Sequence, residues 1–200
     1  MTSTVLGIDP SLRATGYVVA AVGEWVGAPG RTTMRPIEGG WIPTKPSANK
    51  KQMYAADDDT ACARAVVEGL GNVIINHTPA AVFVEAPSGS QSYRGATGNG
   101  IVMGLLAALS WFHTEIPFVW INALTVKVEL LGKRSGSKEE IANEVFFGMG
   151  GMGRIIYKDD GASDAPNFPK KGQEAIIDAA AVLLAAQSTD VYKLLASGGS

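Results

Sequence analysis

The sequence has almost no cysteine and no long apolar run. Cys62 is the single cysteine among 200 residues, which excludes an intrachain disulfide and a cysteine-based metal cluster and favours a reducing compartment. A membrane-spanning helix needs about 18 consecutive apolar residues. The nearest candidate, residues 101–112, is shorter and contains Gly104 and Ser110, as is typical of a buried helix. We expect no membrane contact, no signal peptide and a cytoplasmic location.

Charge is also scarce and nearly balanced. Charged residues make up 18% of the chain, the formal net charge is -2, and the isoelectric point is about 5.7. Proteins that bind nucleic acid over a broad surface are more often basic. A nucleic-acid role would therefore depend on local basic patches or on metal ions. The apolar fraction of 46% and the length are those of one globular domain with a sizeable core.

Hydrophobic periodicity predicts an α/β protein. Strands are expected at residues 4–9, 15–22, 36–43, 80–85 and 117–121, and helices at 54–76, 101–113, 123–132, from 137 onward and at 173–187. Loops are expected at 88–100 and 148–172, and a loosely held tail at 188–200 after a domain at 1–187. This order of elements predicts a five-stranded mixed sheet with helices on both faces.

Two carboxylates stand at the ends of strands that otherwise look fully buried. Asp9 ends the first strand and Glu85 ends the fourth, each after a run of apolar residues. Functional crevices of open α/β sheets lie outside the carboxyl ends of the strands. If these strands are neighbours, the two carboxylates meet there and repel one another, which raises a pKa or calls for a counter-charge. Hard oxygen ligands of this kind select Mg²⁺ or Mn²⁺.

The last expected helix adds two more acids. Asp178 interrupts an apolar stripe, and Glu174 lies four residues earlier on the same helical face. A charge at such a position is costly unless it is paired or bound to a metal. Each acid also has a structural interpretation: Asp9 as a turn cap, Glu85 as a solvated strand end, and Asp178 as the partner of a lysine. Their joint occurrence favours a shared site.

Four segments together resemble the RuvC family of Holliday-junction resolvases, within the RNase H-like superfamily. They are spread over residues 5–187 in the order that the fold requires. The segments are "GIDPSLRATGYVV", "AVFVEAP", "TVKVELLGKRSGSKEEIANEV" and "EAIIDAAAVLLAA".

The resemblance implies a homodimeric endonuclease that cuts branched DNA, chiefly four-way junctions, with two Mg²⁺ or Mn²⁺ ions in each active site. It implies 5′-phosphate and 3′-hydroxyl products. Asp9 would bridge the two ions, Glu85 would bind one of them, and Asp178 would complete the site. The family has an Asp or His three residues before its final Asp, where this chain has Ala175. Glu174, one position earlier, is the candidate for a fourth catalytic and metal-binding carboxylate.

The chain departs from the family after its fourth strand. The family often has an aromatic residue three positions after the strand-four Glu, where this sequence has Ser88, and Tyr93 is the nearest aromatic residue that could replace it. This departure and the low isoelectric point suggest a divergent member, such as a phage-encoded one acting in the host cytoplasm. Tyr93 and several basic side chains are the expected DNA contacts, and the basic ones are Lys127, Lys138, Lys133, Arg134 and Arg94.

Three other classes remain open at this point. The actin-like and sugar-kinase fold also has an Asp after its first strand, but it needs two such domains and a second glycine-rich loop. A ribonuclease H that cuts RNA or RNA–DNA hybrids would place its catalytic Glu on the first helix and an Asp on strand four. A non-catalytic nucleic-acid-binding protein could keep the fold, although the intact acidic positions argue against it.

Overall fold

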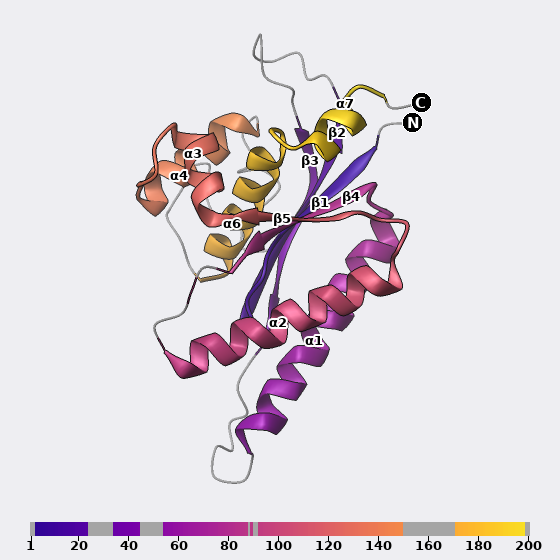
Figure 1. Ribbon diagram of the computed structural model, residues 1–200, viewed down its shortest axis with the longest axis vertical. Helices are drawn as coiled ribbons and strands as arrows, with labels where there is room; N and C mark the ends of the chain where they lie inside the picture. The colour runs from indigo at the N-terminus through magenta and orange to yellow at the C-terminus, as the bar shows by residue number, and fades with distance from the viewer. Residues whose placement is uncertain are drawn as a thin grey trace, which may run out of the picture.

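Five strands form a single mixed sheet in the order β3-β2-β1-β4-β5 (Figure 1). The computed structural model describes residues 3–23, 34–44, 54–87, 89, 92–149 and 171–198. The strands are β1 (Thr4–Asp9), β2 (Ala14–Val22), β3 (Met34–Pro43), β4 (Ala81–Ala86) and β5 (Phe118–Asn122). Strand β2 is antiparallel to β1 and β3, whereas β4 is parallel to β1 and to β5. The mixed sheet expected from the sequence is confirmed.

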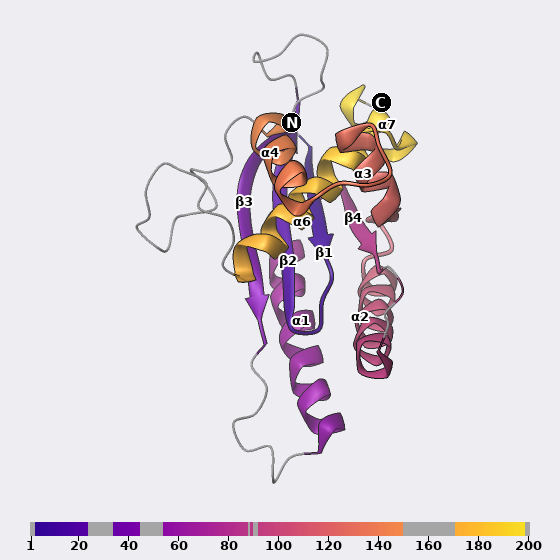
Figure 2. The same ribbon diagram turned by 90° about the vertical axis from the view of Figure 1, so that its left-hand side faces the viewer.

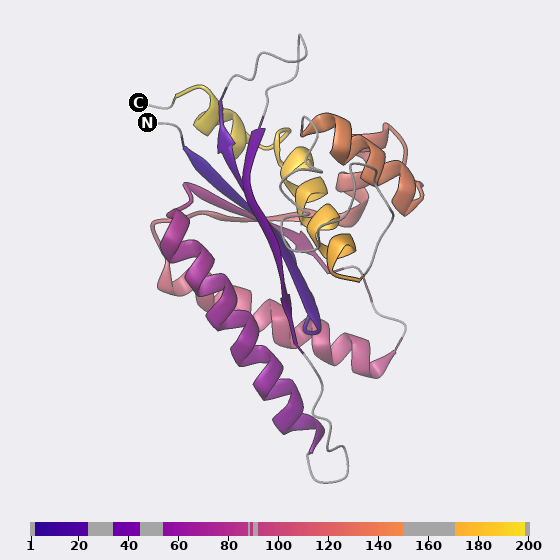
Figure 3. The same ribbon diagram turned by 180° about the vertical axis from the view of Figure 1, so that it is seen from behind.

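Helices cover both faces of the sheet. On one face lie α1 (Ala55–His77) and α2 (Tyr93–Phe112), and on the other lie α3 (Ala123–Leu131), α4 (Lys138–Gly148) and α6 (Lys171–Ala186) (Figures 1 and 3). Helix α6 runs across β1 and β2, as Figure 2 shows. A last short helix, α7 (Asp190–Ala196), follows α6.

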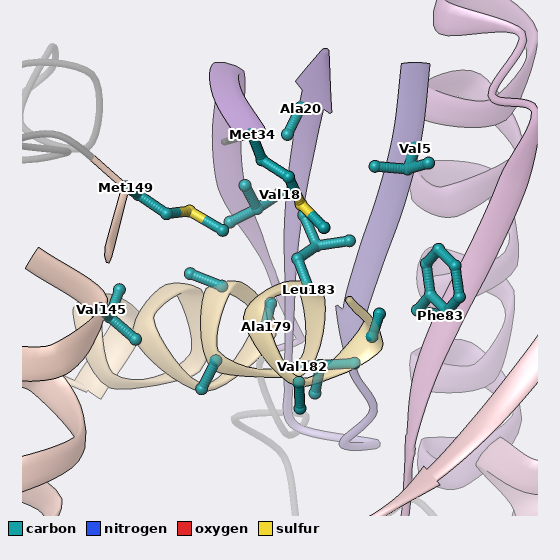
Figure 4. Close-up of a cluster of buried hydrophobic side chains, with 14 of the residues drawn as sticks. Val5, Val18, Ala20, Met34, Phe83, Val145, Met149, Ala179, Val182 and Leu183 are labelled. Carbon is teal, nitrogen blue, oxygen red and sulfur yellow. The ribbon is translucent and has the colours of Figure 1, made fainter. Parts of the chain in front are cut away.

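Alternation along the strands divides the core into two layers. Leu6 and Ile8 of β1 face α1 and α2, whereas Val5 faces α6. Figure 4 shows the second layer, where Ala179 and Leu183 of α6 lie beside side chains of the sheet. Odd-numbered residues of β1 therefore point toward α6, and Asp9 belongs to this series.

Two glycines let α6 lie unusually close to the sheet. A Cβ atom on Gly7 of β1 would lie 2.5 Å from the carbonyl oxygen of Ala179, and one on Gly16 of β2 would overlap with the carbonyl of Ala175. Gly16 is also the β2 residue paired with Asp9. These two contacts fix the position of the α6 segment between Ala175 and Ala179, which includes Asp178.

Helix α2 begins earlier and is more exposed than the sequence suggests. It starts at Tyr93, inside the segment expected to be a loop. The side chain of Ser92 caps the helix by accepting a hydrogen bond from the Gly95 nitrogen at 3.1 Å, and this cap offsets the low helix propensity of the glycines that follow. The expectation of a buried helix is wrong, because Trp111 is 77% exposed and Phe112 is 78% exposed.

By length and composition, α2 is long and apolar enough to cross a membrane. Helices α6 and α7 would pass the same test only if a pair bent by 78° counted as one span. Core helices of soluble proteins also pass it, so the absence of membrane contact stays a prediction.

The chain after residue 187 is also more ordered than expected. Thr189 caps α7 by accepting a hydrogen bond from the Tyr192 nitrogen at 3.3 Å. The Tyr192 side chain is buried and lies against Phe83 of β4, with ring centroids 6.5 Å apart. The expectation of a loose tail fails for this segment because one buried aromatic residue attaches it to the core. Most of the loop expected at 148–172 falls outside the described residues, and the domain boundary at 187 stays a prediction.

Candidate active site

Asp9 and Glu85 are neighbours at the carboxyl edge of the sheet. Strands β1 and β4 are parallel, and the last pair in their register is Ile8 beside Val84. The next position on each strand therefore places Asp9 beside Glu85. Both side chains are on the face that α6 covers, because each belongs to the odd-numbered series of its strand.

Helix α6 brings the third carboxylate to this edge. Asp178 lies one residue before Ala179, whose carbonyl oxygen occupies the space that a side chain on Gly7 would need. The charge of Asp178 raises the pKa of Asp9 and the pKa of Glu85, as expected for carboxylates at the same edge of the sheet. Three of the four acids that the sequence analysis singled out, Asp9, Glu85 and Asp178, thus meet at this edge from three separate elements.

The three carboxylates resist ionisation. Burial first, and then the charges of Asp178 and Glu85, raise the pKa of Asp9 to about 8. Burial and the charge of Asp178 raise the pKa of Glu85 to about 7, and burial also raises the pKa of Asp178. Because like charges repel in a partly buried site, the cluster favours protonation or a bound cation.

Two lysines partly offset this repulsion. Lys127 of α3 lowers the pKa of Glu85, and Lys138, the first residue of α4, lowers the pKa values of Asp9 and Asp178. Lys138 also forms an ion pair with Glu174 in the first turn of α6. Glu174 therefore shares Lys138 with the cluster, and its carboxylate already has an ammonium partner.

The other predicted DNA-binding residues lie apart from the cluster. Lys133 and Arg134 are exposed in the connection between α3 and α4, where Lys133 pairs with Glu140. Ser137 and Glu140 form a capping box at the start of α4, because they exchange hydrogen bonds of 2.8 and 3.1 Å.

Tyr93 and Arg94 begin α2, on the opposite face of the sheet from α6. Tyr93 is 90% exposed. Arg94 donates to Asp59 of α1 at 3.3 Å. The first turns of α2 still lie near the end of β1, because a Cβ atom on Gly98 would be in contact with Leu12. These two residues are thus at the same end of the sheet as Asp9, but not in the same layer.

Arg13 holds the turn after Asp9, and the sequence analysis missed it. Its guanidinium donates to Asp58 and Asp59 at 2.8 Å each and to the Cys62 sulfur at 2.7 Å. A single Arg in a turn gives no periodic pattern in the sequence. Its partners are 45 or more residues away, so they can be identified only once α1 is known to lie beside the turn.

The donor chemistry of the cluster fits a hard divalent cation. Three carboxylates offer oxygen ligands only, and a cation would relieve the repulsion that raises their pKa values. Within the described ranges, however, no three His, Cys, Asp or Glu side chains are already gathered as a ready-made metal site. The cluster therefore fits a divalent cation by the type and the charge of its ligands, and not by a preformed arrangement of them.

Two bacterial RuvC proteins resemble the chain over most of its length. Crossover junction endodeoxyribonuclease RuvC of Trichlorobacter lovleyi is 30% identical over 141 residues, which are 70% of this chain and 70% of that protein. RuvC of Methylococcus capsulatus is 28% identical over 161 residues, or 80% of this chain and 84% of that protein. No model of a known protein family matches the chain.

Solved structures show the same fold. The Thermus thermophilus RuvC structure in complex with a Holliday junction substrate matches with a TM-score of 0.67 and 23% identity, over 98% of this chain and 97% of that one. The yeast mitochondrial Holliday junction resolvase Ydc2 matches with a TM-score of 0.60 and 13% identity, over 98% of this chain and 83% of that one. Together with the strand order, these matches confirm the RNase H-like α/β fold.

Proposed function

The chain belongs to the RuvC family of crossover junction endodeoxyribonucleases, and from this membership we propose that it resolves four-way DNA junctions by metal-dependent phosphodiester hydrolysis. The observation that carries the proposal is the meeting of Asp9, Glu85 and Asp178 at one edge of the sheet. Three partly buried carboxylates with raised pKa values are costly for folding, and such a cost is typical of functional sites. The proposal places the protein in the cytoplasm, with access to recombining DNA.

Asp9, Glu85 and Asp178 would hold Mg²⁺ or Mn²⁺, two ions in each site. Bound ions of this kind activate a water molecule and stabilise the leaving oxygen, giving 5′-phosphate and 3′-hydroxyl ends. The chain itself supplies rigidity, because Asp9 ends a buried strand and Asp178 sits on a helix fixed by its glycine contacts. Glu174, the fourth candidate from the sequence, is instead paired through its carboxylate with Lys138.

The lysines around the cluster would bind the phosphates that flank the scissile bond. Lys127 and Lys138 act on the cluster electrostatically from α3 and α4, so a phosphate bound to them would lie next to the carboxylates. Lys133, Arg134 and Arg94 would extend the contact to more distant phosphates. Because each neutralised phosphate releases counterions, junction binding should weaken steeply as salt rises.

Helix α2 would form the interface of a homodimer. Its mean hydropathy is 1.3 over 18 residues, yet only 17% of that window is buried within one chain. Gly100 and Gly104 have open space beside them, and Met103 and Trp111 are exposed. A second copy of the same helix could approach closely at these glycines and cover the apolar side chains. Two active sites in one dimer would match the two strands that a junction resolvase must cut.

A cleavage assay tests the proposed reaction. The protein is incubated with an end-labelled four-way junction, a linear duplex of the same sequence and an RNA–DNA hybrid, with Mg²⁺, with Mn²⁺ or with chelator. We expect preferential nicking of the junction in the presence of metal, lost in Asp9→Asn and retained in Asp190→Asn, which removes a fully exposed carboxylate of α7. An intact junction under every metal, or preferential cutting of the hybrid, contradicts the proposal.

A further inference from the structure

An ion pair between α4 and α6 lies at the rim of the carboxylate cluster. Lys138 is the first residue of α4, and Glu174 is in the first turn of α6. The Lys138 side chain is 71% exposed and that of Glu174 is 33% exposed, so the pair is on the solvent side. The same ammonium interacts with Asp9 and Asp178. One cation therefore has carboxylates from two elements within its reach.

The position of Glu174 alone would allow it to act either as a metal ligand or as the partner of a lysine. It is one helical turn before Asp178, so both side chains share a face of α6, as two ligands of one ion would. Its carboxylate nevertheless forms a direct ion pair with Lys138, which the three clustered carboxylates do not form within the described residues. A carboxylate that holds an ammonium has less charge to offer a metal ion, and it brings a competing positive charge to the site.

We propose that Glu174 is a positioning residue that holds the Lys138 ammonium at the rim of the Asp9–Glu85–Asp178 cluster, and that it is not a metal ligand. The inference rests on the proposed metal-dependent function. With Glu174 present, the ammonium stays beside α6 and faces incoming DNA. Without it, the carboxylates of Asp9 and Asp178 are the partners left to Lys138 in the cluster, and the ammonium competes there with a divalent cation.

The exposure of the pair suits this role. Exposed ion pairs are weak and exchange readily with other partners. A DNA phosphate can therefore take over Lys138 when the substrate binds, with Glu174 holding the side chain in place until then. A strong buried pair would not release its lysine in this way.

A double-mutant cycle on metal affinity separates the two roles of Glu174. Manganese binding to the full chain without DNA is measured by electron paramagnetic resonance in the parent, Glu174→Gln, Lys138→Met and the double variant. We expect Glu174→Gln to weaken Mn²⁺ binding by roughly three- to tenfold when Lys138 is present, the effect of one charge a few ångströms away. In the Lys138→Met background the same substitution should have no effect, and in Lys138→Arg its effect should persist.

Equal weakening by Glu174→Gln with and without the Lys138→Met change would establish Glu174 as a ligand and overturn the inference. Asp9→Asn serves as the reference in the same assay and should weaken Mn²⁺ binding in every background. If Asp9→Asn leaves binding unchanged, the metal site itself is wrong, and the proposed function fails along with the inference. Thermal unfolding of all variants in chelator shows that each is folded.

Discussion

Replacing Asp9 with Asn should make the metal-free protein more stable, and increasingly so as the pH rises. Asp9 is half-buried at the end of β1, where burial and the charges of Asp178 and Glu85 raise the pKa of its carboxylate from 3.8 to about 8. The unfolded chain has no such environment. Asparagine has nearly the same shape and cannot ionise, so the variant removes the electrostatic cost and keeps most of the local packing.

The direction in which stability changes with pH follows from the raised pKa of Asp9. Well below pH 4, Asp9 is protonated in both the folded and the unfolded state, so folding buries no charge at this position. As pH rises toward 8, the unfolded state loses its proton while the folded state keeps it, so the parent becomes progressively less stable. Each pH unit in this window costs at most about 1.4 kcal/mol. Between about pH 5 and pH 8 the stability advantage of Asp9→Asn should grow by about 2 to 4 kcal/mol.

Urea unfolding in EDTA at pH 5, 6, 7 and 8 measures this difference. The parent and Asp9→Asn are compared with Asp190→Asn, which removes a fully exposed carboxylate from α7 and controls for the loss of one negative charge. The free energy of unfolding comes from linear extrapolation at each pH. Addition of Mg²⁺ at pH 8 should then stabilise the parent and the control but not Asp9→Asn, because only the ionised carboxylate binds the ion.

A difference between Asp9→Asn and the parent that stays constant from pH 5 to pH 8 would refute this reasoning. So would a difference that shrinks as pH rises. Either result would mean that Asp9 ionises in the folded protein at least as easily as in the unfolded chain, and that burial and the neighbouring carboxylates do not raise its pKa.

Three further substitutions test the packing and the assembly. Gly16→Ala should lower the free energy of unfolding in urea by about 1 to 3 kcal/mol or more, and should also lower junction cleavage, because its Cβ overlaps with the carbonyl of Ala175. The control Gly71→Ala has open space beside it and should be neutral or stabilising by about 0.5 to 1 kcal/mol. Tyr192→Phe should leave the unfolding free energy unchanged or raise it by up to about 1 kcal/mol, since the buried hydroxyl has no hydrogen-bond partner among the described residues, and a clear loss would reveal one. Gly104→Arg fits a single chain but not a close helix pair, so sedimentation should show monomers in place of dimers, and an unchanged mass would exclude this interface.

The element types and their order were predictable because they depend on local patterns. Strands with long apolar runs and helices with regular spacing give signals that hold in any tertiary context, and all five strands were located to within two residues. The segment at 93–100 was missed because glycine lowers helix propensity, and the cap at Ser92 and the packing of α2 against the core are needed to overcome it. The short helix α7 was missed because its stability comes from burial of Tyr192 against the sheet.

By itself, the sequence determined the acids at the strand ends and on the last helix, and the family to which the chain belongs. Such side chains stand out because a charge within an apolar segment is costly unless it is paired or bound to a metal. The tertiary structure alone decided how close α6 comes to the sheet, since Gly7 and Gly16 act only when a helix lies over them. It also decided that Arg13 binds α1 and that Glu174 binds Lys138. Such partners are tens of residues apart, and a charge has no preferred partner along the chain until folding brings one within a few ångströms.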